Sequence, residues 1–139
     1  MTYPNLLSTT IPNKDLKEII DAINLINEKL SDLVTLDREE LDALPKTGSD
    51  TIKFVLDNLK VAESHPDLVP KDVDLDEIKK DVKLIHSIYK ILTPIKKLEK
   101  KLEDSALLAG SEAYLPSIAI YNAVKADDLK KRHSHKVQA

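Results

Sequence analysis

Five polar side chains that could support ligand binding or acid–base chemistry lie close together in the sequence: Glu112, Tyr114, Tyr121, Asn122 and Lys125. In a helix, Tyr114, Tyr121 and Lys125 share one face, whereas Glu112 and Asn122 lie about 160° and 80° away from that face. One hypothesis is a small-ligand or enzymatic pocket in which Lys125 or Glu112 exchanges protons beside the tyrosines. The alternative, which we favour, is helix packing with a polar rim, because tyrosine hydroxyls find partners when they are buried.

Other reactive centres are excluded by residue type. The chain has no cysteine, which excludes disulfides, thiolate metal sites and cysteine nucleophiles. Two glycines cannot form a phosphate-binding loop, and no Gly-x-Ser-x-Gly motif is present. Di-iron bundles need Glu-x-x-His pairs, which do not occur, and His133 and His135 lie beside basic residues. We therefore predict no catalytic residue, no metal and no cofactor.

Composition indicates one globular domain over residues 1–139. The chain is 42% hydrophobic and 32% charged, with a net charge of −3, and this length can bury roughly two-thirds of the unfolded surface. Mixed charge and 4% aromatic residues argue against a nucleic-acid partner. No apolar stretch is long enough to span a membrane, and residues 1–5 lack the features of a secretion signal. We expect a cytoplasmic protein without membrane or nucleic-acid partners.

Apolar spacing predicts the first helices. Residues 1–12 contain two prolines and read as an N-terminal arm. Apolar side chains then recur in steps of three and four, which predicts a helix over 14–34. Asp37, followed by Glu40 at the third helical position, predicts a short helix over 38–44.

Similar signals predict the next two helices. A second long helix opens near Thr47 or Ser49 and ends around Ser64, before a loop over 65–73 that two prolines constrain. Asp74 repeats the capping pattern, so the third long helix runs from about residue 75. Its apolar seam shifts in phase at Pro94, where we expect a kink.

Two boundaries between the third and fourth long helices are compatible with the sequence. A start at Asp104 or Ser105 places four small residues, Ala106, Gly110, Ala113 and Ser117, on one side of the fourth helix, and we favour it. A start at Ser111 would place Pro116 in a first turn, where proline is tolerated. The basic tail, 130–139, is expected to fray.

Together these elements predict an all-α fold. No segment shows the alternation of a strand. Four main helices with short links predict an antiparallel up-and-down four-helix bundle, with the short helix inserted between the first two long ones.

Several segments resemble an uncharacterised family of small bacterial helical proteins. The most specific is the Asp-Ser-Ala-Leu-Leu-Ala-Gly-Ser-Glu-Ala-Tyr run over 104–114, followed by Tyr121-Asn122-x-x-Lys125. Residues 33–40, 44–48 and 65–70 add to the resemblance, which spans about 14–125. It implies a bacterial helical bundle and no reaction. Family members continue with a Pro-Gly-Ala turn, whereas this chain continues with Ala-Asp-Asp-Leu over 126–129.

The leading hypothesis for function comes from the residues on two helix faces. The broad apolar stripe of the first helix and the small-residue face of the fourth offer more packing surface than one antiparallel neighbour uses. We therefore expect a non-enzymatic bundle that binds another helix, as a homo-oligomer or with a protein partner. The alternative is the ligand or enzymatic site around 112–125.

Overall fold

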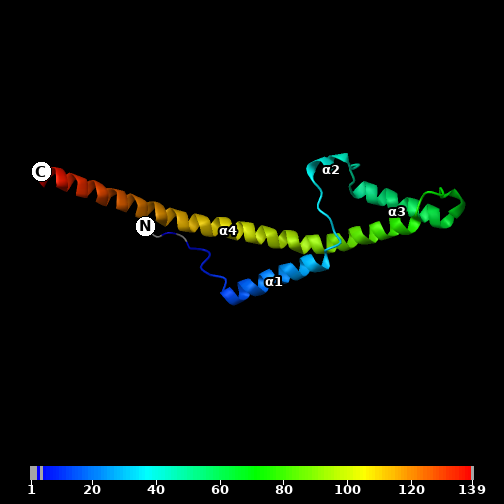
Figure 1. The fold of residues 1–139 in the computed structure, drawn as a ribbon, viewed down its shortest axis with the longest axis horizontal. Coiled ribbons are helices and arrows are strands. Elements are labelled where there is room, and N and C mark those ends of the chain that lie inside the picture. Colours follow the sequence, from blue (N-terminus) through cyan, green and yellow to red (C-terminus); the bar gives the residue numbers. More distant parts are fainter. Residues whose placement is uncertain (1–2, 4, 139) are drawn as a thin grey trace. The chain divides into compact units, whose positions relative to one another are not determined.

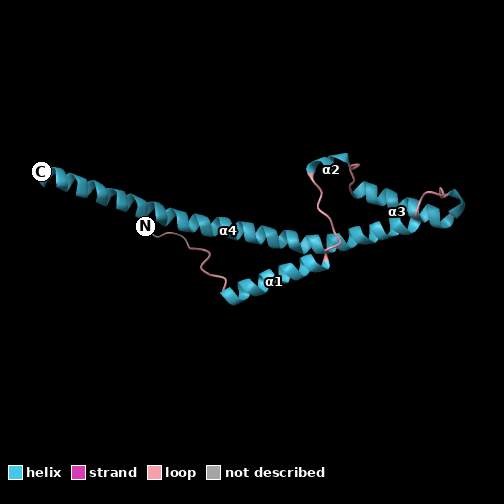
Figure 2. Cartoon of the chain, viewed as in Figure 1, coloured by secondary structure: helices cyan, strands magenta, loops and turns pink. Residues whose placement is uncertain are grey.

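A computed structural model describes residue 3 and residues 5–138, with side chains described up to residue 134. The described chain is helical and contains no strand (Figures 1 and 2), which confirms the predicted all-α class. The elements are α1 (Asn13–Lys29), α2 (Arg38–Ala43), α3 (Ser49–Ser64), the single-turn 3-10 helix η1 (Pro66–Leu68) and α4 (Leu75–Gln138).

Side-chain caps start two of the helices as predicted. Asp37 Oδ1 accepts a hydrogen bond from the Glu40 backbone N–H at 2.8 Å, at the start of α2. Asp74 Oδ1 accepts from the N–H groups of Asp76 and Glu77 at 3.0 and 3.3 Å, at the start of α4. These bonds satisfy donors that have no partner within the helix, which is why aspartate is favoured at this position.

Helix α1 ends at Lys29, so the predicted extension to residue 34 is wrong. The chain turns here, because the Ser31 N–H bonds the Glu28 carbonyl at 3.4 Å and the Leu33 N–H bonds the Leu30 carbonyl at 3.0 Å. Serine and aspartate, at 31 and 32, favour turns over helix interiors because their side chains compete for backbone hydrogen bonds. The helical spacing of apolar residues continues beyond Lys29, which is why the sequence predicted a longer helix.

Helix α4 is one continuous helix, so both predicted boundaries between a third and a fourth long helix are wrong. Gly110 does not adopt the positive φ that ends many helices. The surrounding leucine, alanine, lysine and glutamate residues are strong helix formers, and they carry the helix through Pro116 in its interior. The hydroxyl of Ser117 donates to the Ala113 carbonyl at 2.7 Å in the adjoining turn.

The ends of the chain are described in part. The arm has no regular structure over residues 5–11, and residues 1, 2 and 4 lie outside the described residues. The backbone of α4 continues through the basic tail to Gln138. Residue 139 and the side chains of 135–138 lie outside the described part, and the predicted fraying of 130–139 stays a prediction.

Backbone contacts divide the chain into two units, residues 12–92 and residues 1–11 with 93–139. In the first unit, α3 folds back antiparallel to the beginning of α4 (Figure 1). Lys79 Nζ lies 3.2 Å from Glu63 Oε1 at one end of this helical hairpin. The half-buried apolar residues that face each other are Ile52, Val55, Leu59 and Ala62 on α3, and Leu75, Ile78, Val82, Ile85 and Ile88 on α4.

No side chain in the described part of the chain is fully buried. Apolar contact in residues 12–92 is concentrated on the α3–α4 seam, where the side chains are half-buried. The apolar stripe of α1 is exposed, with Leu16, Ile19, Ile20, Ile23 and Ile26 between 42% and 48% accessible. The four-helix bundle and the single domain stay predictions.

The Asp74 cap provides a test of how the hairpin is held together. Replacing Asp74 with Ala is expected to lower the free energy of unfolding by about 1 kcal/mol, because two N–H groups at the start of α4 lose their acceptor. Urea denaturation followed by circular dichroism measures the change. Asp72→Ala, which removes a carboxylate from the same connection, is the matched control. Equal losses in the two variants would contradict the assignment.

Candidate functional site

The five polar residues predicted as a pocket all lie on α4 within the second unit. Tyr114 and Tyr121 are 65% and 61% exposed, and Asn122 and Lys125 are also exposed. Glu112 alone among them is half-buried. The tyrosine side chains are therefore exposed, and their hydroxyls do not need a hydrogen-bond partner in the protein as buried hydroxyls do.

The structure brings two of these residues together. Lys125 Nζ lies 5.7 Å from the centre of the Tyr121 ring, within the range of a cation–π contact. Their spacing of four residues makes them neighbours on the helix surface. Glu112 and Asn122 lie on other faces of α4, as their positions in the sequence indicate. A ligand pocket formed by all five residues stays a prediction.

Glu112 makes a contact that the sequence did not predict. Its Oε1 atom accepts a hydrogen bond from the Leu7 backbone N–H at 3.1 Å. A hydrogen bond to a charged acceptor contributes about 1.5–3 kcal/mol. The other oxygen, Oε2, is buried and accepts no hydrogen bond from the described residues, which offsets part of that gain. The carboxylate thus links the N-terminal arm to α4.

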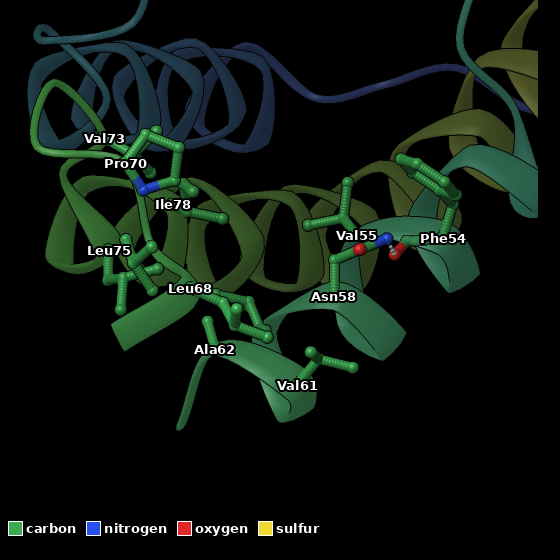
Figure 3. Close-up of a pocket in the computed structure, with 12 residues that line it drawn as sticks. Phe54, Val55, Asn58, Val61, Ala62, Leu68, Pro70, Val73, Leu75 and Ile78 are labelled. Atoms are coloured by element: carbon green, nitrogen blue, oxygen red, sulfur yellow. Dashed lines mark hydrogen bonds between the residues drawn. The ribbon is translucent and has the colours of Figure 1, made fainter. Parts of the chain in front are cut away.

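An apolar pocket of about 400 Å³ lies between α3, the connection after it and the first turns of α4 (Figure 3). It is lined by Phe54, Val55, Asn58, Leu59, Val61, Ala62, Leu68, Val69, Pro70, Val73, Leu75 and Ile78. Leu68 and Val69, which come from the loop between Pro66 and Pro70, are among the lining residues, and Leu68 is 66% exposed.

The chemistry available in the apolar pocket is limited to packing. Asn58 is the one polar residue among those lining it, and its Nδ2 donates to the Phe54 carbonyl at 2.8 Å. None of the lining side chains can act as an acid, a base or a nucleophile at neutral pH. Sequence analysis missed this pocket, although the apolar residues placed between Pro66 and Pro70 were a signal for it.

A second hollow, of about 410 Å³, lies at the opposite end of the α3–α4 hairpin. Residues 47–49 and Ile52 line it from the start of α3, and Ile85, His86 and Tyr89 line it from α4. The apolar side chains again come from the facing seams of the two helices. Both hollows are therefore features of one incompletely filled helix–helix contact.

An exposed ion pair on α4 changes the pKa of a lysine. Asp104 Oδ2 lies 2.7 Å from Lys100 Nζ, and this hydrogen bond, together with charge attraction, raises the pKa of Lys100. The contact is complete at neutral pH and is lost at alkaline pH, as the solution passes through the raised pKa. Both groups are exposed, so solvent screens their interaction.

Among the described residues, no three histidine, aspartate or glutamate side chains form a group that could hold a metal ion. No helix in the described ranges has the length and apolar character needed to cross a bilayer.

Comparison of the chain with known protein families, curated proteins and solved structures gives no match. The resemblance to small bacterial helical proteins therefore stays an expectation from the sequence. The function proposed below is therefore inferred from the geometry of the chain itself.

The apolar seam should stabilise the hairpin more than any exposed apolar side chain does. Leu59→Ala is expected to lower the free energy of unfolding by about 1.5 kcal/mol, because a half-buried side chain leaves the α3–α4 contact. Leu107, which is 76% exposed on α4, provides a matched Leu→Ala control with an expected change near zero. Thermal and urea unfolding curves measure both, and an equal effect in L107A would contradict the assignment.

Proposed function

We propose that this protein is a non-enzymatic helical module that acts by binding helices, through self-association in the first instance or through a protein partner. The exposed apolar stripe of α1 is the observation that carries this proposal. We propose that the protein has no catalytic residue and no cofactor. We also propose that it acts in the cytoplasm of a bacterial cell, as expected from the sequence.

Helix α1 has the surface of a helix that packs against another one. Its apolar side chains recur in steps of three and four, yet each of the five is more than two-fifths exposed. Solvated charged residues occupy the other faces, so the helix is amphipathic. Helices in proteins draw most of their stability from packing an amphipathic face, and this 17-residue helix leaves its apolar face exposed.

The energetics of the whole chain favour association. Ordering the backbone costs about 1–2 kcal/mol per residue, and apolar burial is the main compensating contribution. The described chain buries no side chain completely. Contact with other copies supplies additional burial, as in homodimers whose folded state depends on protomer concentration.

We propose that association of copies forms the antiparallel bundle predicted from the sequence. We infer that the α3–α4 hairpin supplies one antiparallel pair and that α1 helices supply further members. On α4, the small residues Ala106, Gly110, Ala113 and Ser117 would allow close approach of another helix, and the space around Gly110 is open. The expected kink at Pro94 belongs to the same proposal, since proline removes one hydrogen bond within α4.

A ligand or enzymatic site around 112–125 is the second candidate. It is favoured by the contact between Lys125 and Tyr121 and by the partly buried carboxylate of Glu112. The exposed tyrosine rings and the separate faces of Glu112 and Lys125 make it the weaker proposal.

Sedimentation equilibrium tests self-association. The wild-type chain is expected to have a multiple of the single-chain mass. Ile23→Glu should weaken association by at least about tenfold, because it places a charge in the apolar stripe that must be desolvated. Asn24→Glu introduces the same side chain one position along, outside the stripe, and should leave the mass unchanged. A strictly monomeric wild-type chain would contradict the proposal.

A further inference from the structure

A contact between distant parts of the sequence lies outside the surfaces that the proposed function uses. The Leu7 N–H donates to Glu112 Oε1 across 105 positions of sequence. Leu7 is half-buried, whereas the preceding Leu6 is 82% exposed. Both partners belong to the same structural unit, and the arm runs beside α4 at this point (Figure 1). The arm is thus held on the helix by a defined contact.

The half-buried residues of α4 near the Leu7 contact lie on one face of the helix. The half-buried residues in this part of the helix are Ser105, Leu108, Glu112 and Pro116, which we call the strap face. Their spacing of three, four and four residues confines them to an arc of about 80°. Tyr114 and Leu107, which point elsewhere on the same turns, are 65% and 76% exposed. The reduced exposure is therefore local to the side on which the arm lies.

The strap face is distinct from the small-residue face of α4. Ala106, Gly110, Ala113 and Ser117 are centred about 125° around the helix from the strap face. These four residues are exposed, so the arm does not cover them. Helix α4 consequently has one face to which the arm is anchored and another that is exposed.

Only one of the two carboxylate oxygens of Glu112 takes part in the contact with the arm. One carboxylate oxygen of Glu112 accepts the bond from Leu7, whereas Oε2 is buried with no donor in the part of the chain that the structure describes. An acceptor that loses water without gaining a donor is destabilising. The cost at Oε2 offsets part of the gain at Oε1, which weakens the attachment of the arm at this anchor. Such a contact can be displaced.

We propose that the N-terminal arm is a removable strap that keeps the strap face of α4 out of self-association, with Glu112 as its positioning residue. This inference rests on the proposed function, because it concerns copies of the chain that associate. With the arm closed, α4 offers the small-residue face. With the arm released from Glu112, the strap face is also available and α4 offers two different faces. Chains that associate through two different faces form open assemblies unless the rotation between them closes a ring.

Hydrogen exchange measured by mass spectrometry on the full chain tests the anchor. In Glu112→Ala, exchange at the Leu7 amide should rise by about tenfold, since its acceptor is gone. Glu112→Gln keeps a carbonyl oxygen at this position and should give a smaller increase. Glu103→Ala, a carboxylate removed from another face of α4, is the matched control and should behave as wild type. Unchanged exchange at Leu7 in E112A would overturn the inference.

Sedimentation velocity on the same variants tests the role of the strap. E112A should form assemblies larger than those of wild type, and E103A should not. Leu7→Pro removes the N–H donor, whereas Leu7→Ala keeps it, so L7P should reproduce the effect of E112A more fully than L7A does. An unchanged distribution of assemblies after the arm is freed would overturn the strap. A monomeric wild-type chain whose protected arm is freed in E112A would instead reject the proposed function and leave the anchor in place.

Discussion

Burial of the apolar side chains that recur along the helices is the interaction on which this structure depends, and much of that apolar surface is exposed. The seam between α3 and the first turns of α4 buries part of it, with side chains that are half-buried on both helices. The stripe of α1 and much of α4 contribute apolar surface that is still exposed. Since burial of such surface is the main favourable term in folding, this exposed surface is the physical reason for our proposal that the chain associates with other helices.

The polar features of the chain serve this arrangement of helices more readily than they serve a reaction. Asp37 and Asp74 begin helices, Lys79 joins α4 to Glu63 on α3, and Lys125 rests over Tyr121 on the surface. Glu112 is the exception, because its half-buried carboxylate reaches a segment far away in sequence. That contact accounts for a glutamate at this position without requiring acid–base chemistry.

Local signals in the sequence predicted local structure well. The capping aspartates, the loop with Pro66 and Pro70, and the end of α3 at Ser64 were all predictable, because each depends on backbone hydrogen bonding within a few residues. The end of α1 and the continuity of α4 were not, since Gly110 and Pro116 are compatible with either a boundary or a helix interior. The Leu7–Glu112 bond and the apolar pocket depend on which segments meet, which helical periodicity alone does not specify.

The concentration dependence of thermal unfolding, followed by circular dichroism, tests the central claim most directly. If association supplies burial that the single chain lacks, the midpoint temperature must rise as protein concentration increases, because mass action favours the associated folded state. A single cooperative transition with the same midpoint at every concentration would contradict the account, since it would show that one copy holds all the interactions needed to fold.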